Sequence, residues 1–370
     1  MAWIWERENW TNFSYDMVVL APLLEAARLK RAGIEASLLL FGFNLQQATY
    51  LESVTREVLF SGEIEGEVFA PEAVRSSVAR RLGMDVGAVL SQDRRIEGVV
   101  EMALDATRNP DLALNRERLF HWHQLLFPEG RSGMHRITTG GWRRDLDGPM
   151  RVISGSIGKE KEHFRAPPAQ RIEVEMEQFL SWFESSAASS AENSLLKSAL
   201  AHFWFITIHP FDDGNGRIAR AIADLQLTRA EKNTQRWYSM SAAIRKDRKS
   251  YYLILEETQR GSGDLTLWLF WYLGCMISAM ESAHESLERG AASLRFWAYA
   301  RHYSLNDRQR HMLSLLLEGF EGKLTSSKWA ALSHCSQDTA TRDINALIEA
   351  GLLSKGSAGG RSTEYVLMER

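Results

Sequence analysis

Apolar side chains recur at intervals of three and four residues along most of the chain, which is the spacing of a helix with one buried face. The clearest segments with this pattern are 17–30, 112–126, 171–183, 195–208 and 218–227. An uncharged run at 265–280 is shorter than the ~20 residues of a membrane-spanning helix. We therefore predict a mainly α fold in which 265–280 is a buried core helix and no segment crosses a membrane.

The segment 143–168 departs from this pattern, because it is rich in glycine, proline and β-forming residues. Within it, two short runs at 150–154 and 162–165 are separated by glycines, and a pair of prolines follows. This composition predicts a small β-hairpin between helices.

The C-terminal segment 303–370 has the pattern of a separate unit. Asn306, Thr325 or Ser326, and Ser336 are placed to cap three successive helices. Two short strands around a glycine-rich turn come next. Three helices and a hairpin predict a winged helix-turn-helix domain, a fold that reads DNA in many proteins.

Charge argues against DNA binding by this segment. Residues 305–370 contain eight Lys/Arg and eight Asp/Glu, and the candidate recognition helix at 336–350 carries Arg342 beside three acidic residues. Non-specific DNA affinity comes mostly from neutralising phosphates. A homodimer or another protein contact is therefore the favoured role, and DNA binding is the second.

The composition of the whole chain is that of a globular protein, with 370 residues of which 45% are hydrophobic and 25% charged. This length predicts two or three domains, and a net charge of -3 gives no strong field for nucleic acid or anionic membrane. Two cysteines are too few for a disulfide framework, and the first residues do not resemble a signal peptide. We expect a cytoplasmic location.

The segment 209–220, HPFDDGNGRIAR, is the strongest candidate for chemistry. As a hairpin turn it would join two strands, but both of its flanks have helical patterns. An EF-hand calcium loop aligned on Asp213, Asn215 and Gly216 would have Phe211 at its first position and Ile222 at its last. Both positions need calcium ligands, and neither side chain can be one. The remaining interpretation is a phosphate-binding loop between two helices.

The residue types of this loop support phosphate binding. Gly214 and Gly216 let the backbone approach a ligand closely, and the free N–H groups of a helix's first turn attract an anion. Arg217 and Arg220 share one helix face and can hold successive phosphates. Without an anion, each cation in a first turn would be unfavourable by ~0.3 to 1 kcal/mol.

Two further residues fit the same site. Asp213 offers a carboxylate for Mg²⁺, which prefers one or two carboxylates together with phosphate oxygens. A lone histidine such as His209 is more often structural, but beside a phosphate and metal site a general base is the better interpretation.

HPFDDGNGR with a further arginine at 220 matches the Fic family motif, HPFx(D/E)GNGRxxR, at every defined position. The surrounding helices are also similar to that family, and the hairpin at about 142–168 resembles the Fic flap. The resemblance implies a Fic-type helical core at 106–295, which includes this flap. An N-terminal helical region at 1–105 precedes this core, and the winged helix at 303–370 follows it.

The resemblance implies transfer of AMP from ATP to a Ser, Thr or Tyr hydroxyl of a protein, with release of pyrophosphate. His209 would take the hydroxyl proton, and Asp213 would hold Mg²⁺. The α- and β-phosphates of ATP would contact Gly214, Asn215 and Gly216. Arg217 would bind the β-phosphate, and Arg220 the γ-phosphate.

The hairpin and a tyrosine complete the expected site. An edge strand at Val152, Ile153 and Ser154 could pair with an extended target segment, unless the hairpin is only structural. Tyr252 could form a wall for the nucleotide base, although Tyr251 and Tyr252 could equally be a core aromatic pair.

A short upstream motif, S-x-x-x-E-G at Ser61, Glu65 and Gly66, is weak alone and is more often an exposed helix end. In a chain with the Fic motif it resembles the inhibitory motif of self-inhibited members. Glu65 would then pair with Arg220 and occupy the guanidinium that the γ-phosphate of ATP needs. In some relatives the same glutamate also supports removal of AMP.

The leading hypothesis is therefore a self-inhibited protein adenylyltransferase that uses ATP and Mg²⁺, acts on a protein and can modify itself. The alternative from another class is a winged-helix DNA-binding regulator with the Fic core as a nucleotide sensor. A third hypothesis keeps the enzyme but changes the donor to UTP, or the direction to AMP removal.

Overall fold

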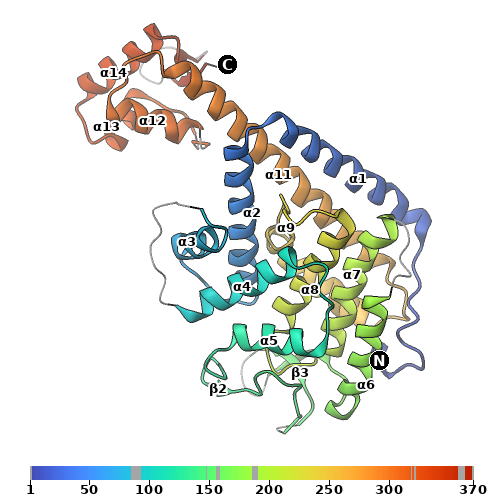
Figure 1. Cartoon of the computed structure of the whole chain (residues 1–370). Coiled ribbons are helices and arrows are strands. Elements are labelled where there is room, and N and C mark those ends of the chain that lie inside the picture. Colours follow the sequence, from blue (N-terminus) through green and yellow to red (C-terminus); the bar gives the residue numbers. More distant parts are fainter. Residues whose placement is uncertain are drawn as a thin grey trace. The chain divides into compact units, whose positions relative to one another are not determined.

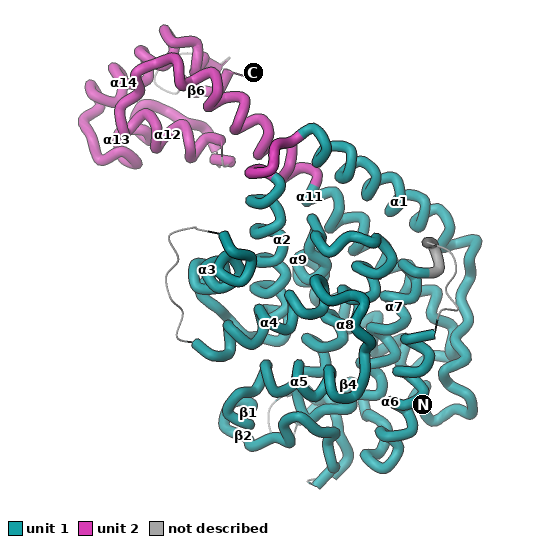
Figure 2. The backbone as a smooth tube through the Cα atoms, in the orientation of Figure 1, with its two compact units in different colours: residues 1–40, 46–283 teal, residues 41–45, 284–370 magenta. Residues whose placement is uncertain are grey.

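The computed structural model describes residues 2–84, 93–146, 148–155, 159–185, 191–317, 319–320, 322–356 and 363–368, with the backbone alone at 191–193. Figure 2 shows two compact units, one of residues 1–40 with 46–283 and one of residues 41–45 with 284–370. Helices make up most of both units, as the sequence predicts.

Long helices build the first unit, and two of them continue into the second (Figure 1). In chain order the helices up to residue 300 are η1 (Ile4–Glu6), α1 (Met17–Leu40), α2 (Phe43–Ile64), α3 (Pro71–Arg81), α4 (Arg94–Arg108), α5 (Arg116–Leu126), α6 (Ala169–Glu184), α7 (Ala191–Ile208), α8 (Asn215–Glu231), α9 (Met240–Lys246), α10 (Arg248–Gln259) and α11 (Thr266–Ala300). Each segment that the periodicity predicts to be helical lies within or overlaps one of them.

Some helix limits differ from the prediction. Helix α5 begins at Arg116 and not at Leu112, because the Asn115 side chain accepts a hydrogen bond from Arg118 N at 2.9 Å and caps the helix there. Helix α1 continues ten residues beyond Lys30, to Leu40. The expected domain limits near 105 and 295 fall inside α4 and α11, and those limits stay a prediction.

Helices α7 and α8 form the centre of the first unit and pack against each other. Both are buried on most faces, and Phe203 and Phe205 of α7 and Ile218 and Ile222 of α8 are fully buried. A helix that is apolar on most faces, as α7 is, belongs in the interior, and α8 also buries polar side chains there. The loop that joins this pair, residues 209–214, is therefore held between two rigid helix ends.

The run 265–280 is a core helix, as predicted. It opens α11, and its side chains Trp268, Leu269, Tyr272 and Met276 are buried. No helix in the described ranges is long and apolar enough to cross a membrane.

The predicted hairpin is present. Strand β3 (Arg151–Ser154) pairs antiparallel with β4 (Lys161–Arg165), and the register shifts between Val152 and Ile153. Residues 156–158, in the turn, lie outside the described part of the chain. Periodicity did not predict the second small pair, β1 (Arg131–Ser132) with β2 (His135–Arg136), because two residues are too few for a pattern.

The second unit contains helices α12 (Asp307–Leu317), α13 (Ser326–Leu332) and α14 (Gln337–Glu349), followed by the antiparallel strands β5 (Leu353–Lys355) and β6 (Tyr365–Leu367). Asn306, Thr325 and Ser336 accept hydrogen bonds from backbone N–H groups in the first turns of these helices, which confirms the predicted caps. The unit has its own core, which includes Trp329 and Ile344.

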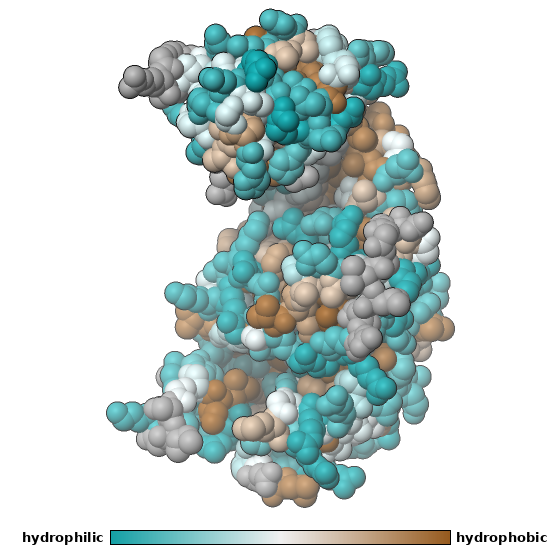
Figure 3. Space-filling view, turned by 90° about the vertical axis from the view of Figure 1, so that its left-hand side faces the viewer, coloured by the Kyte–Doolittle hydropathy of each residue, from teal (hydrophilic) through white to brown (hydrophobic). Residues whose placement is uncertain are grey.

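These elements are the ones that a winged helix-turn-helix contains, and that assignment stays a prediction. The glycine-rich turn at 357–362 lies outside the described residues. On the face of this unit that Figure 3 shows, in the upper part of the view, hydrophilic residues predominate.

Candidate active site

The loop between α7 and α8 is fixed by one buried ring and one amide. The Phe211 ring is fully buried and stacks on the His123 ring with 4.2 Å between centroids. The Asn215 side chain accepts a hydrogen bond from Phe211 N at 3.0 Å and donates one to Phe211 O at 2.8 Å. The Asn215 side chain therefore helps to hold the loop, and because its Nδ2 carries two N–H donors, its expected contact with phosphate oxygens stays a prediction.

Arg143, which the sequence analysis missed, ties this loop to the base of the hairpin. Its Nε donates to His209 O at 2.7 Å, its Nη2 donates to Pro167 O at 2.5 Å, and it forms an ion pair with Asp145. The side chain is almost completely buried. Nothing in the local sequence distinguishes Arg143, since its partners are contributed by the tertiary fold.

His209 is held in the neutral form with one nitrogen available. Its Nδ1 lies 3.2 Å from Ile206 O. A carbonyl oxygen can only accept, so Nδ1 carries the hydrogen and Nε2 keeps its lone pair. Burial lowers the pKa of His209 to about 4, so the ring is neutral at pH 7. A neutral imidazole with a free Nε2 can act as a general base.

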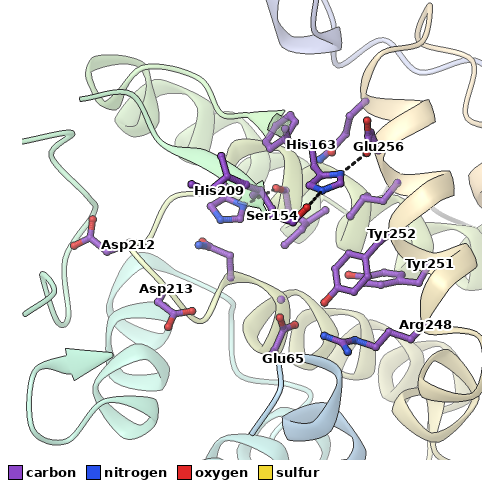
Figure 4. A pocket seen from close by; sticks show the side chains of 18 residues that line it. Glu65, Ser154, His163, His209, Asp212, Asp213, Arg248, Tyr251, Tyr252 and Glu256 are labelled. Atoms are coloured by element: carbon purple, nitrogen blue, oxygen red, sulfur yellow. Dashed lines mark hydrogen bonds and ion pairs between the residues drawn. The ribbon is translucent and has the colours of Figure 1, made fainter. Parts of the chain in front are cut away.

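A cavity of about 490 Å³ opens beside His209 (Figure 4). Its walls come from the 209–216 loop, the hairpin, helix α10 and the residue that follows α2. This volume is within the ~300–1,000 Å³ typical of small-molecule sites. The structure therefore brings the expected site residues His209, Asp213, Gly216 and Tyr252 together at one cavity.

A carboxylate lies against the start of α8. Gly214 precedes the helix with φ +81°, a conformation that favours glycine. A Cβ placed on Gly216 would lie only 2.1 Å from Glu65 Oε1, so this carboxylate rests directly on the Gly216 backbone. Only glycine leaves room there for an acidic group, whether it belongs to Glu65 or to a ligand.

Glu65 also contacts Arg220, as the resemblance implies. Arg220 Nη2 lies 2.8 Å from Glu65 Oε1, and the same guanidinium donates to Ser61 Oγ at 3.0 Å and to Ser61 O at 2.9 Å. Burial alone would lower the pKa of Arg220, but the Glu65 carboxylate together with Tyr251 and Tyr252 outweighs it and raises that pKa. Gly66, with φ +86°, lets the chain turn away immediately after α2.

A second carboxylate, which the sequence did not predict to be part of the site, pairs with the other arginine, Arg217. Glu67 Oε2 lies 2.7 Å from Arg217 Nη1, and Arg217 is almost completely buried. The sequence signal for this contact was available but weak, because it is only the acidic spacing Glu65-x-Glu67. One short segment after α2 therefore places a carboxylate on each of the two arginines of the loop.

Both arginines nevertheless keep a nitrogen that makes no hydrogen bond in the part of the chain described. Arg217 Nε and Arg220 Nη1 are buried, and no acceptor meets either of them in good hydrogen-bond geometry. Buried donors without partners are rare in folded proteins and call for an explanation. An anion larger than one carboxylate, such as a chain of phosphates, would supply the missing acceptors.

Asp213 lies at the mouth of the cavity, where a metal ion bound to phosphates could reach it. Its carboxylate accepts from Gly214 N at 2.5 Å and from Ser132 Oγ, and it remains nearly half exposed. The described residues contain no cluster of three or more acidic, histidine or cysteine side chains that could hold a metal alone. One carboxylate suits Mg²⁺ only if phosphate oxygens and waters complete its coordination, so the donor set fits a metal that arrives with a nucleotide.

The two adjacent tyrosines have different environments. Tyr251 is buried and its hydroxyl lies 3.0 Å from His202 Nε2, so it belongs to the core. Tyr252 lines the cavity, donates to Ile64 O at 3.1 Å, and has the Arg248 guanidinium 5.5 Å from its ring centroid. Tyr251 is therefore a core residue that also borders the cavity, and the role of Tyr252 as a wall for the nucleotide base stays a prediction.

The hairpin presents the backbone of β3 to the cavity. Val152, Ile153 and Ser154 line the cavity and are exposed. One edge of β3 pairs with β4, and among the described residues no strand pairs with its other edge. An unpaired edge can accept an extended segment by strand addition, so the docking interpretation stays a prediction that this geometry permits.

Comparison with known proteins gives a family for this arrangement. Residues 113–227 match the model of the Fic/DOC family, and residues 3–84 match a domain of unknown function (DUF4172). The whole 209–220 loop lies in the first match, whereas Glu65 and Glu67 lie in the second.

Two curated relatives are similar over part of their length. A uridine 5'-monophosphate transferase of Xanthomonas campestris pv. campestris (strain 8004) is 33% identical over 117 residues, which are 30% of this chain and 20% of that protein. A protein adenylyltransferase Fic of Drosophila mojavensis is 27% identical over 229 residues, 59% of this chain and 42% of that protein. The matches thus span less than half of either relative.

A solved Fic family protein from Desulfovibrio desulfuricans G20 has the same fold. It is 21% identical, covers 93% of this chain and 96% of its own length, and has a TM-score of 0.51. Fold and site together define a helical protein with a histidine beside a glycine-rich helix start. The chain contains a Fic/DOC family domain at residues 113–227, and its fold is that of a solved Fic family protein.

Proposed function

We propose that this protein is a self-inhibited adenylyltransferase, which moves AMP from ATP to a Ser, Thr or Tyr hydroxyl of a protein and releases pyrophosphate. The observation that carries the proposal is the pairing of a neutral histidine, with Nε2 free, and two buried arginines that keep unused donors. The first supplies a base, and the second a phosphate site whose donors the two carboxylates satisfy only in part. The printed names of the relatives, which are transferases of nucleoside monophosphates, support the same reaction class.

The chain's own residues divide the work of transfer. His209 Nε2 accepts the proton of the target hydroxyl while that oxygen attacks the α-phosphorus of ATP, and the bond from this phosphorus to the oxygen of pyrophosphate breaks. The first turn of α8, with Arg217 and Arg220, orients the phosphates and neutralises their charge. Asp213 would hold Mg²⁺, which when bound adds positive charge at the phosphates.

Inhibition in this proposal is competition between anions. Glu65 occupies Gly216 and Arg220, and Glu67 occupies Arg217, so ATP must displace two carboxylates to reach the same donors. Charge-assisted hydrogen bonds of this kind contribute ~1.5–3 kcal/mol each. Because both carboxylates lie on one short segment, one movement of that segment would release both arginines.

The direct test of the base is His209→Ala in a chain already activated by Glu65→Gly. Labelled ATP and Mg²⁺ are added to a bacterial lysate, and label on lysate proteins is measured. Glu65→Gly should label proteins, and Glu65→Gly with His209→Ala should not. Undiminished labelling of lysate proteins by the double variant would show that the base is another residue.

The nucleotide and the direction of transfer need parallel assays. The relatives include both a uridine 5'-monophosphate transferase and adenylyltransferases, so labelled UTP is compared with ATP at equal concentration. We expect ATP to be preferred. Glu65 could also support the removal of AMP. This reaction is measured as the loss of label when the unaltered protein is added to lysate proteins labelled beforehand. Preference for UTP would show that the donor is not ATP, and rapid removal of AMP would show that the protein acts in the opposite direction.

A second candidate function, DNA binding by the C-terminal unit, gains support from one contact. Asp343 of α14 is buried and bound by Arg308 Nε at 2.9 Å and by Asn306 Nδ2 at 2.9 Å, so it adds no negative charge to the helix surface. Arg342 beside it is exposed. Binding to duplex DNA that weakens with salt and is lost in Arg342→Ala would support this function, and no binding at low salt would exclude it.

A further inference from the structure

Three side chains at the rim of the His209 cavity form a continuous hydrogen-bond chain. Ser154 Oγ lies 2.6 Å from His163 Nε2, and His163 Nδ1 lies 2.7 Å from Glu256 Oε2 (Figure 4). They come from β3, β4 and α10, and all three line the same cavity as His209. Neither the sequence motif nor the mechanism proposed above uses His163 or Glu256.

The carboxylate at the end of this hydrogen-bond chain determines which atoms donate and which accept. A carboxylate can only accept, so His163 Nδ1 donates to Glu256. His163 Nε2 then keeps its lone pair, and the Ser154 hydroxyl donates its hydrogen to it. A hydroxyl bonded to a histidine that a carboxylate orients is the arrangement of an activated serine nucleophile.

The local fold positions the histidine for this contact. Across the hairpin Val152 pairs with Phe164 and Ile153 with Glu162, so His163 is an extra residue on β4 without a partner on β3. A bulge of this kind redirects a side chain and is common beside active sites. Helix α10 holds the other end, because Arg260 lies 3.5 Å from Glu256 Oε1 and donates to Glu162 O at 3.2 Å.

We propose that Ser154 is an acceptor of the nucleotidyl group on the chain itself, with His163 as its general base and Glu256 as the positioning residue of that base. This inference rests on the proposed function, since the donor is the same nucleoside triphosphate. It names the residue and the base of a self-modification that would otherwise have no site.

The proposed step balances without a further reactant. Ser154 Oγ forms a bond to the α-phosphorus of the nucleoside triphosphate, and its proton passes to His163 Nε2. The bond from the α-phosphorus to the oxygen that bridges to the β-phosphate breaks, and pyrophosphate leaves. The product is a phosphodiester at Ser154, and His163 returns its proton to solvent.

The product would lie on the strand edge that the proposed function assigns to target docking. Ser154 is the last residue of β3, and its neighbours Val152 and Ile153 form the unpaired edge. A nucleoside monophosphate attached there is a bulky anion beside that edge, so self-modification would limit transfer to other proteins.

The test maps the modified residues by mass spectrometry after Glu65→Gly protein is incubated with labelled ATP and Mg²⁺ in a lysate. We expect label on lysate proteins and on Ser154. Adding His209→Ala should remove label from lysate proteins while Ser154 keeps it, because the Ser154 proton goes to His163. Adding His163→Gln should reduce label on Ser154 at least ~100-fold, the lower end of a general base's contribution.

A matched pair on α10 tests the positioning residue. In the Glu65→Gly background, Glu256→Gln should lower the labelling of Ser154 at least ~tenfold, whereas Glu257→Gln, one residue along and exposed, should not. Labelled lysate proteins with an unmodified Ser154 would overturn this inference and leave the proposed function standing. No label on any protein would overturn both, and equal Ser154 labelling with and without His163 would exclude that histidine as the base.

Discussion

At the scale of single residues, the site depends on a histidine in an uncommon backbone conformation. His209 has φ +53°, in the left-handed region that non-glycine residues rarely adopt. The contacts of its backbone with Phe205 and Arg143 hold it there. This geometry keeps the ring at the cavity with Nδ1 on a carbonyl, which leaves Nε2 as the atom that we propose accepts the proton.

The lowered pKa of His209 predicts the pH dependence of transfer. Its pKa is lowered from 6.5 to about 4, so the base form persists as pH falls through the ordinary histidine range. The kcat/KM of Glu65→Gly, which reports the free enzyme, should stay nearly constant down to about pH 5 and decline below it. Circular dichroism at each pH checks that the fold is intact. An acid limb centred near 6.5 would contradict this account of the base.

Glu67 should restrain the enzyme independently of Glu65. Replacing Glu67 by glutamine removes the negative charge that faces Arg217 but keeps a side chain of the same size. ATP then competes with one carboxylate fewer. We expect Glu67→Gln to lower the apparent KM for ATP by about tenfold, equivalent to ~1.4 kcal/mol. The measurement is transfer rate against ATP concentration. An unchanged KM would mean that Glu67 only packs against the loop.

At the scale of elements, the sequence predicts what periodicity and capping chemistry can specify. The apolar spacing identified α7 and α8 because they are long and buried on most faces. It misjudged the start of α5, where the Asn115 side chain and not the apolar pattern decides the first turn. The two-residue strands β1 and β2 carry too little pattern to be recognised, and they were missed.

Two helical glycines give opposite predictions for stability. A Cβ on Gly98 of α4 would lie 1.9 Å from Leu125 O of α5, whereas a Cβ on Gly33 of α1 would meet nothing within 4 Å. Gly98→Ala should therefore lower the free energy of unfolding by about 1–3 kcal/mol. Gly33→Ala should raise it by up to about 1 kcal/mol. Urea denaturation of both variants measures this, and a change of the same sign in both would contradict the packing of α4 on α5.

At the scale of the whole molecule, the site joins segments that the sequence separates widely. Arg220 meets Ser61 and Glu65 from the region that matches the domain of unknown function, and only the resemblance to a self-inhibited family predicted that contact. No resemblance predicted Arg143, Glu67 or His163, whose partners become neighbours only when the chain folds. Residue-by-residue patterns cannot supply such pairings, because they depend on how helices and hairpin are assembled.

The second unit should be stabilised by its own core. Trp329 is fully buried among residues 296–353, all outside the catalytic loop. Trp329→Ala should destabilise this unit by about 3–5 kcal/mol. Hydrogen exchange should then speed up at 307–349 while 195–231 keeps its protection, and Glu65→Gly with Trp329→Ala should transfer label at the rate of Glu65→Gly alone. Faster exchange in both regions would show that the two cores are coupled.

One comparison directly tests the proposal that carboxylates after α2 restrain a complete transferase. Labelling of lysate proteins by ATP is measured for the unaltered protein, for Glu65→Gln and for Glu63→Gln, whose carboxylate pairs with Arg245 at 2.8 Å and not with Arg217 or Arg220. We expect little labelling by the unaltered protein and by Glu63→Gln, and at least ~tenfold more by Glu65→Gln. Equal labelling by all three proteins would contradict it.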